Sequence, residues 1–96
     1  MNINEAVKKA HSIAKSKGFW DDGRTFAETC MLIVTEISEA VQEDRKSHRG
    51  KMAGEIADAT IRIFDLAGSL GIDLEEEIRK KMEINQKREY KHNRRY

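Results

Sequence analysis

Acidic side chains recur at three-residue intervals in the middle of the chain. Glu36 and Glu39 form one pair, and Glu55 and Asp58 form a second. In a helix, side chains three residues apart lie on one face. Clustered carboxylates repel one another unless a cation neutralises them, and several hard oxygen ligands suit Mg²⁺, with Mn²⁺ as a substitute. The two pairs therefore indicate a divalent metal site, provided that their helices are neighbours.

A solvated helix face is the alternative interpretation of each pair taken alone, because glutamate-rich helices are common. Two features favour the metal interpretation. The pairs occur on consecutive expected helices, and both border apolar residues, with Leu32 sharing the face of Glu36 one turn earlier.

Cationic and amide side chains continue the apolar stripe of the last expected helix. Leu74 and Ile78 begin that stripe, and the positions in line with them are Lys81, Asn85, Arg88 and His92. Cations and an amide are the donors that a phosphate chain and sugar hydroxyls require. Two alternatives remain open. The helix extends beyond the bundle and these side chains are solvated, or the basic residues 79–96 form a nucleic-acid-binding surface.

Two aromatic residues lie in the turn-rich connector 18–24. Trp20 could serve as a stacking platform for a base. The alternative, with equal weight, is that Phe19 and Trp20 cap a small core. We expect His11 to be an ordinary helix residue and Cys30 to belong to the core, because no nucleophile arrangement surrounds it.

The elements that must position these groups are four helices, expected at about residues 3–17, 25–45, 51–70 and 73–90. Capping residues and glycines set their ends: Asn2 with Glu5, Thr25 with Glu28, Asp73 with Glu76, Gly18 and Gly71. The chain contains no proline, and the loops are short. We therefore predict an all-α fold, an antiparallel four-helix bundle within a single domain spanning residues 1–96.

Composition limits the possible partners and compartment. The 96 residues are 36% charged, with a net charge of −5 over residues 1–78 and +6 over residues 79–96. A chain this small has a marginal core, so we expect it to assemble as a homo-oligomer. No apolar run approaches the roughly 18 residues of a membrane span, so no membrane partner is expected. The single cysteine favours the cytoplasm.

The order of these motifs resembles the MazG-like all-α nucleoside triphosphate pyrophosphohydrolases. The resemblance runs from about residue 10 to His92 and rests on KGFW (17–20), EISEA (36–40), EIAD (55–58), Lys81, Asn85 and Arg88. It implies a homodimer or tetramer that uses Mg²⁺ to cleave a (d)NTP between the α- and β-phosphates, giving (d)NMP and pyrophosphate.

The resemblance also implies roles for individual residues. Glu36, Glu39, Glu55 and Asp58 would bind the metal, and Lys81, Asn85 and Arg88 would hold phosphate and sugar. We expect Glu39, or less favourably Glu36, to take the proton of the attacking water. The competing hypothesis is a non-catalytic helical module that binds nucleic acid or nucleotide through its basic C-terminal helix. The in-line phase of that helix argues against nucleic acid as the partner.

Overall fold

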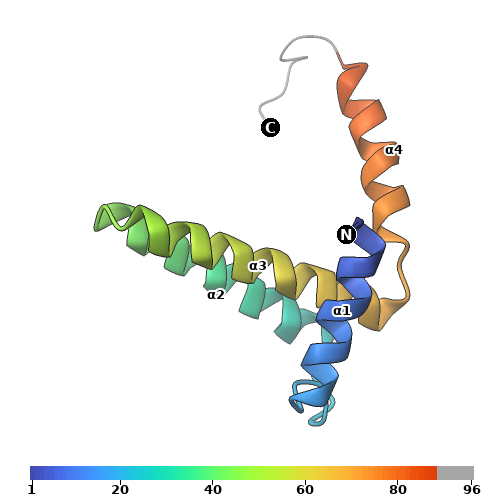
Figure 1. Ribbon diagram of the computed structural model, residues 1–96, viewed down its shortest axis with the longest axis horizontal. Coiled ribbons are helices and arrows are strands. Elements are labelled where there is room, and N and C mark those ends of the chain that lie inside the picture. The colour runs from blue at the N-terminus through green and yellow to red at the C-terminus, as the bar shows by residue number, and fades with distance from the viewer. Residues whose placement is uncertain (89–96) are drawn as a thin grey trace.

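The structure, a computed structural model, describes residues 1–88 and contains four α-helices and no strand in that range (Figure 1). The helices are α1 (Ile3–Ser16), α2 (Phe26–Arg45), α3 (Arg49–Leu70) and α4 (Leu74–Gln86). The all-α prediction is therefore confirmed. None of the helices in residues 1–88 is both long enough and apolar enough to cross a membrane.

Local capping chemistry begins and ends the helices as the sequence predicts. Thr25 and Glu28 form a reciprocal capping box, each side chain accepting from the other's backbone N–H at 3.1 Å. Asn2 caps α1 by accepting from the Glu5 N–H, and Gly71 ends α3 in the left-handed conformation (φ 67°).

Two helix ends differ from expectation. The loop after α2 has only three residues, 46–48, because His48 bonds back to Glu43 through its backbone N–H and its ring, so α3 begins at Arg49. Helix α4 ends at Gln86, not near Tyr90, which lies outside the described residues. Its last turns bury no residue, so packing does not extend the helix.

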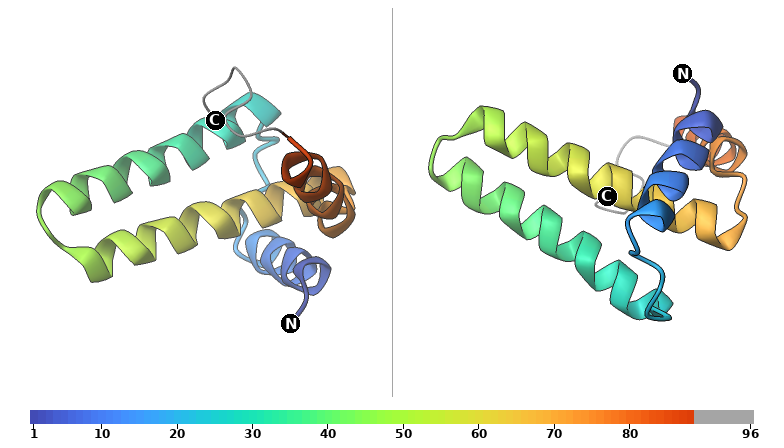
Figure 2. Two further views of the ribbon diagram at one scale, coloured as in Figure 1. Left: turned by 90° about the horizontal axis from the view of Figure 1, so that it is seen from above. Right: turned by 60° about the horizontal axis from the view of Figure 1, so that its bottom comes forward.

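A helical hairpin forms the body of the molecule. Helices α2 and α3 lie side by side and fold back on each other, while α1 packs against α3 near the open end of the hairpin (Figure 2). Gly68 permits the α1–α3 contact, because a Cβ at that position would lie 2.7 Å from the Cβ of His11. The buried core is small and consists of Val7, Thr29, Ile33, Ala40, Ala59, Asp65 and Ala67.

The start of α4 is bonded to the start of α1. The Glu75 carboxylate accepts from the backbone N–H groups of Ile3 (3.0 Å) and Asn4 (3.3 Å). In return, the Asn4 side chain accepts from the Glu75 N–H and donates to Asp73. A side chain at the start of each helix thus accepts hydrogen bonds from backbone N–H groups of the other helix that have no acceptor within their own helix.

Many of the apolar residues that recur at helical spacing along α2 and α3 are exposed. Ile37 is 51% and Ile56 is 53% exposed, although Ile33 and Ala59 are buried. We call the exposed set the apolar face; it comprises Phe26, Val34, Ile37 and Val41 on α2 and Ile56, Ile63 and Leu70 on α3. On each of the two helices, the apolar face lies beside the residues that pack between α2 and α3, and it is rotated from them in the same direction about the helix axis. Because the helices run in opposite directions, the set forms one side of the hairpin, with α1 on the other.

Candidate functional site

Three glutamates meet near the middle of the hairpin. Glu36 and Glu39 come from α2 and Glu55 from α3, and one carboxylate oxygen of each lies within 4.8 Å of the others. The three-residue spacing on α2 and the fold-back of α3 bring them together. Glu36 and Glu55 are half-buried and Glu39 is exposed. We call this set the glutamate cluster.

The glutamate cluster brings like charges close together. Hydrogen bonding to Glu39, followed by burial and hydrogen bonding to Glu36, raises the pKa of Glu55 to about 7. The Oε2 atom of Glu55 is buried and has no hydrogen-bond partner among residues 1–88. In the same part of the chain, Glu36 is the one member of the cluster with a cationic partner, the Arg62 guanidinium, whose Nε donates to Oε1 at 3.0 Å. The free carboxylate atoms therefore fit a hard divalent ion such as Mg²⁺.

Asp58, the fourth predicted ligand, is not one of the three clustered carboxylates. It is exposed and, together with Glu36, lines a neighbouring cavity. It lies about 4.5 Å further along α3 than Glu55, and its side chain is one methylene shorter. The structure thus brings together three of the four predicted metal ligands and places the fourth at the edge of the site.

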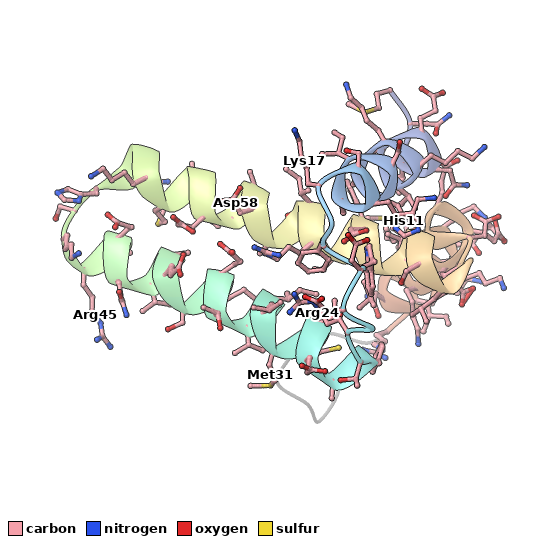
Figure 3. The ribbon with its side chains drawn as sticks, turned by 90° about the horizontal axis from the view of Figure 1, so that it is seen from below. His11, Lys17, Arg24, Met31, Arg45 and Asp58 are labelled. Carbon is pink, nitrogen blue, oxygen red and sulfur yellow. The ribbon has the colours of Figure 1, made fainter. Side chains whose placement is uncertain are left out.

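The cavity beside the glutamate cluster lies between α1, the connector and α3, and has a volume of about 350 Å³. Its walls are apolar on the α1 side and carry charged groups on the α3 side. Figure 3 places His11 on α1 and Arg24 in the connector near the open end of the hairpin, with Asp58 further toward its turn. The lining residues are Ala10, Ile13, Ala14, Lys17, Phe19, Glu36, Asp58, Ile61, Arg62 and Asp65.

Phe19, not Trp20, is the connector aromatic that lines the cavity. The guanidinium carbon of Arg24 lies 4.4 Å from the centroid of the Phe19 ring, and that of Arg62 lies 5.4 Å from it. Trp20 packs edge-on against Phe19, with ring centroids 5.3 Å apart. Trp20 is not among the residues that line the cavity, and its role as a base platform stays a prediction.

Asp65 links α3 to α1 and the connector. Its Oδ1 accepts from Trp20 Nε1 at 2.9 Å and lies 2.8 Å from His11 Nδ1. Sequence reasoning assigned no role to Asp65 and treated His11 as an ordinary helix residue. These contacts join positions 45 and 54 residues apart, and no local pattern in the sequence points to them. Arg62 and Arg24 were missed for the same reason.

The predicted substrate-binding residues of α4 lie apart from the glutamate cluster and the cavity. Lys81 and Asn85 are exposed, and none of the residues lining the cavity comes from α4. Arg88 follows the end of the helix, and His92 lies outside the described residues. Within one chain, the structure therefore does not bring Lys81 or Asn85 to the cavity beside the carboxylates.

Comparison with known proteins finds no match: no family model, no curated protein and no solved structure matches the chain.

Proposed function

We propose that the chain is a Mg²⁺-dependent, MazG-like nucleotide pyrophosphohydrolase that cleaves a (d)NTP between its α- and β-phosphates. One observation carries the proposal: the carboxylates of Glu36, Glu39 and Glu55 converge beside a cavity of about 350 Å³. A ligand in the cavity would have its phosphates next to a cation site, as triphosphate chemistry requires. The motif order described above supports the same family.

The glutamate cluster would hold the metal, with Asp58 at its edge. A Mg²⁺ ion bound there, or Mn²⁺ in its place, would offset the charge of the carboxylates and of the triphosphate. Displacing the proton from Glu55 is part of this binding, because a carboxyl group binds a hard cation only when ionised. The buried Glu55 Oε2, which has no hydrogen-bond partner, supports the assignment.

Glu39 is the preferred acceptor for the proton of the attacking water. Glu36 already accepts from Arg62 through Oε1, whereas Glu39 is exposed and has no cationic partner among the described residues. An exposed carboxylate at the edge of the site can reach a water directly or through a second water. In this step the water oxygen would bond to phosphorus as the bridging bond between the α- and β-phosphates breaks, Glu39 would take the proton of the water, and pyrophosphate would depart.

The phosphate-binding side chains of α4 would come from a second copy of the chain. Within one chain, Lys81 and Asn85 do not line the cavity. The apolar face leaves seven large side chains between 41% and 60% exposed, an arrangement that favours burial against another protein surface. A homodimer, or a tetramer made of such dimers, would cover this face and bring the α4 of one copy near the carboxylates of the other.

The proposal is tested by measuring pyrophosphate release from a panel of NTPs and dNTPs in the presence of Mg²⁺. We expect turnover by the wild-type chain and its loss in Glu39→Gln, with helical circular dichroism unchanged. Asp44→Asn is the matched control, because Asp44 is exposed on the same helix and does not belong to the glutamate cluster. Absence of release across the whole panel, or wild-type turnover by Glu39→Gln, would reject the site.

The non-catalytic alternative predicts a different measurement. A module that binds nucleic acid through its basic end would lose strong duplex affinity steeply as salt rises. In the described part of that end, Arg79 pairs with Glu76 and Glu83, and Lys80 pairs with Glu77. These pairs reduce the free positive charge available to a polyanion and so favour the nucleotide proposal.

A further inference from the structure

The cavity under α1 has the composition of a site for a flat, largely apolar group. Side chains from α1 and α3 and the Phe19 ring form its walls, and about 350 Å³ lies at the lower end of the range for small-molecule sites. Glu36 belongs to both the cavity lining and the glutamate cluster. A nucleotide with its phosphates at the cluster would therefore place its base in the cavity.

Asp65 is the buried polar residue among those that line this cavity. It is only 4% exposed, and Asp65 and Thr29 are the two buried polar residues in the described part of the chain. Both of its donors, His11 Nδ1 and Trp20 Nε1, bond to the same atom, Oδ1. No described residue donates to Oδ2. The carboxylate is thus held firmly at one oxygen, while its other oxygen retains its capacity to accept.

We infer that Asp65 Oδ2 accepts a hydrogen bond from the exocyclic amino group of a nucleobase, so that the cavity selects amino-bearing bases. This inference rests on the proposed function for the position of the phosphates. Adenine and cytosine each carry an amino group at the ring position where hypoxanthine, and uracil or thymine, carry a carbonyl oxygen, whereas guanine carries its amino group at a different ring position. A carbonyl oxygen facing a carboxylate oxygen would leave two acceptors unpaired and in repulsion.

The rest of the cavity supports a base as the occupant. Arg62 lies between Phe19 and Glu36, since its guanidinium carbon is 5.4 Å from the Phe19 ring centroid and its Nε donates to Glu36. A planar guanidinium held in this way provides a stacking surface for an aromatic base. The one buried acceptor then decides which edge of the base is tolerated, because the apolar walls cannot distinguish an amino group from a carbonyl.

The first experiment compares dATP with dITP, which differ in having an amino group or a carbonyl at one ring position, and dCTP with dUTP. We expect kcat/KM to be about 10- to 100-fold higher for the amino-bearing member of each pair, the discrimination that one buried hydrogen bond provides. Asp65→Asn should reduce or reverse this ratio, because an amide can turn its NH₂ toward a carbonyl oxygen. Asp22→Asn, on an exposed connector residue, should leave the ratio unchanged.

The ratio of kcat/KM between two substrates of one variant does not depend on the fraction of folded enzyme. A binding measurement tests the inference even if the protein does not turn over. Trp20, the only tryptophan, bonds to Asp65, so its fluorescence can report binding at the cavity. Wild-type protein is titrated with dAMP and with dIMP. If the wild-type protein hydrolyses both members of each substrate pair with the same kcat/KM, the base inference is overturned and the proposed function stays intact. Tighter binding of dAMP with no hydrolysis supports the inference and rejects the function, and equal binding with no hydrolysis rejects both.

Discussion

Arg62 Nε donates to Glu36 Oε1 at 3.0 Å, so one member of the glutamate cluster is neutralised by a side chain of the protein itself. Glu55, which lies across from Glu36, has no such partner, and its pKa is raised to about 7. The two carboxylates thus have different surroundings: Glu36 accepts a hydrogen bond from a guanidinium, whereas Glu55 binds a proton near neutral pH. This difference has a measurable effect on stability.

We predict that the stability of the metal-free protein falls as pH rises from about 5 to 7.5. The pKa of Glu55 is about 7 in the folded chain and has an ordinary value of 4.5, so the folded state binds this proton more tightly than the unfolded state. The resulting stabilisation is complete below pH 4.5 and is lost as pH rises through 7. Urea unfolding in EDTA measures the decline, which Glu55→Gln should weaken. An equal decline in wild type and Glu55→Gln would contradict the prediction.

Magnesium should reverse this loss of stability. At pH 7.5 the cluster has lost its proton, and a divalent cation that binds only the folded state raises the free energy of unfolding as its concentration increases. We expect the thermal midpoint of the wild-type chain to rise with added Mg²⁺ and to fall again on chelation. Glu55→Gln should respond much less, and Asp44→Asn should respond like wild type. A wild-type midpoint insensitive to Mg²⁺ and Mn²⁺ would argue against the metal site.

Substitution of Gly68 tests the contact between α1 and α3. An alanine Cβ at this position would lie 2.7 Å from His11 Cβ and 3.4 Å from a Val7 methyl. Because these atoms must move apart, Gly68→Ala should lower the free energy of unfolding by about 1–3 kcal/mol. Gly54→Ala is the control on the same helix, where nothing lies within 4 Å of the added methyl; it should stabilise by about 0.5–1 kcal/mol. Urea midpoints that move in the same direction for both variants would show that the helices do not approach closely.

The apolar face predicts the oligomeric state. Ile37 lies at the centre of the α2 part of this face and is 51% exposed in one chain. If a second copy covers the face, Ile37→Glu should bury a charge at the interface and yield monomers. Thr35→Glu places the same charge on the other side of α2 and should leave the assembly intact. Light scattering after size-exclusion chromatography distinguishes the outcomes, and a monomeric wild-type chain at micromolar concentration would reject the interface.

A mixing experiment tests whether two copies share a site. Glu39→Gln and Lys81→Ala should each be inactive when pure. If the Glu39 of one copy works with the Lys81 of its partner, mixed dimers contain one intact site, and random exchange of subunits restores about a quarter of wild-type activity. Mixing after brief unfolding and refolding allows exchange. Failure to recover activity, with mixed dimers demonstrated by mass spectrometry, would place both residues in the site of a single copy.

Local sequence signals predicted the starts of α1, α2 and α4 and the glutamate cluster. The Thr25–Glu28 box forms within three residues, so its sequence determines it directly. The glutamate pairs follow from helix periodicity together with the short loop 46–48, which folds α3 back beside α2. Asp58 shares the helix periodicity but lies at the edge of the site, since spacing alone does not account for side-chain length or for the position of α1.

Long-range contacts account for what the sequence did not predict. The bonds of Asp65 to His11 and Trp20 depend on the direction in which α1 crosses α3, and that direction depends on the absence of a side chain at Gly68. The phase of α4 was taken to indicate a core-facing stripe, yet α4 contains no buried residue in a single chain. Periodicity identifies which residues share a face, but it does not identify the surface that this face meets.

The reciprocal bonds between Asn4 and Glu75 make α1 the support from which α4 projects. Helix α4 is 13 residues long, or about 20 Å, so a small rotation at its bonded end becomes a displacement of several ångströms at its far end. Helix α1 also forms one wall of the cavity. A ligand that tilted α1 on entering the cavity would therefore swing Lys81 and Asn85 through a larger arc, and would couple occupation of the cavity to the position of the side chains proposed to bind phosphate.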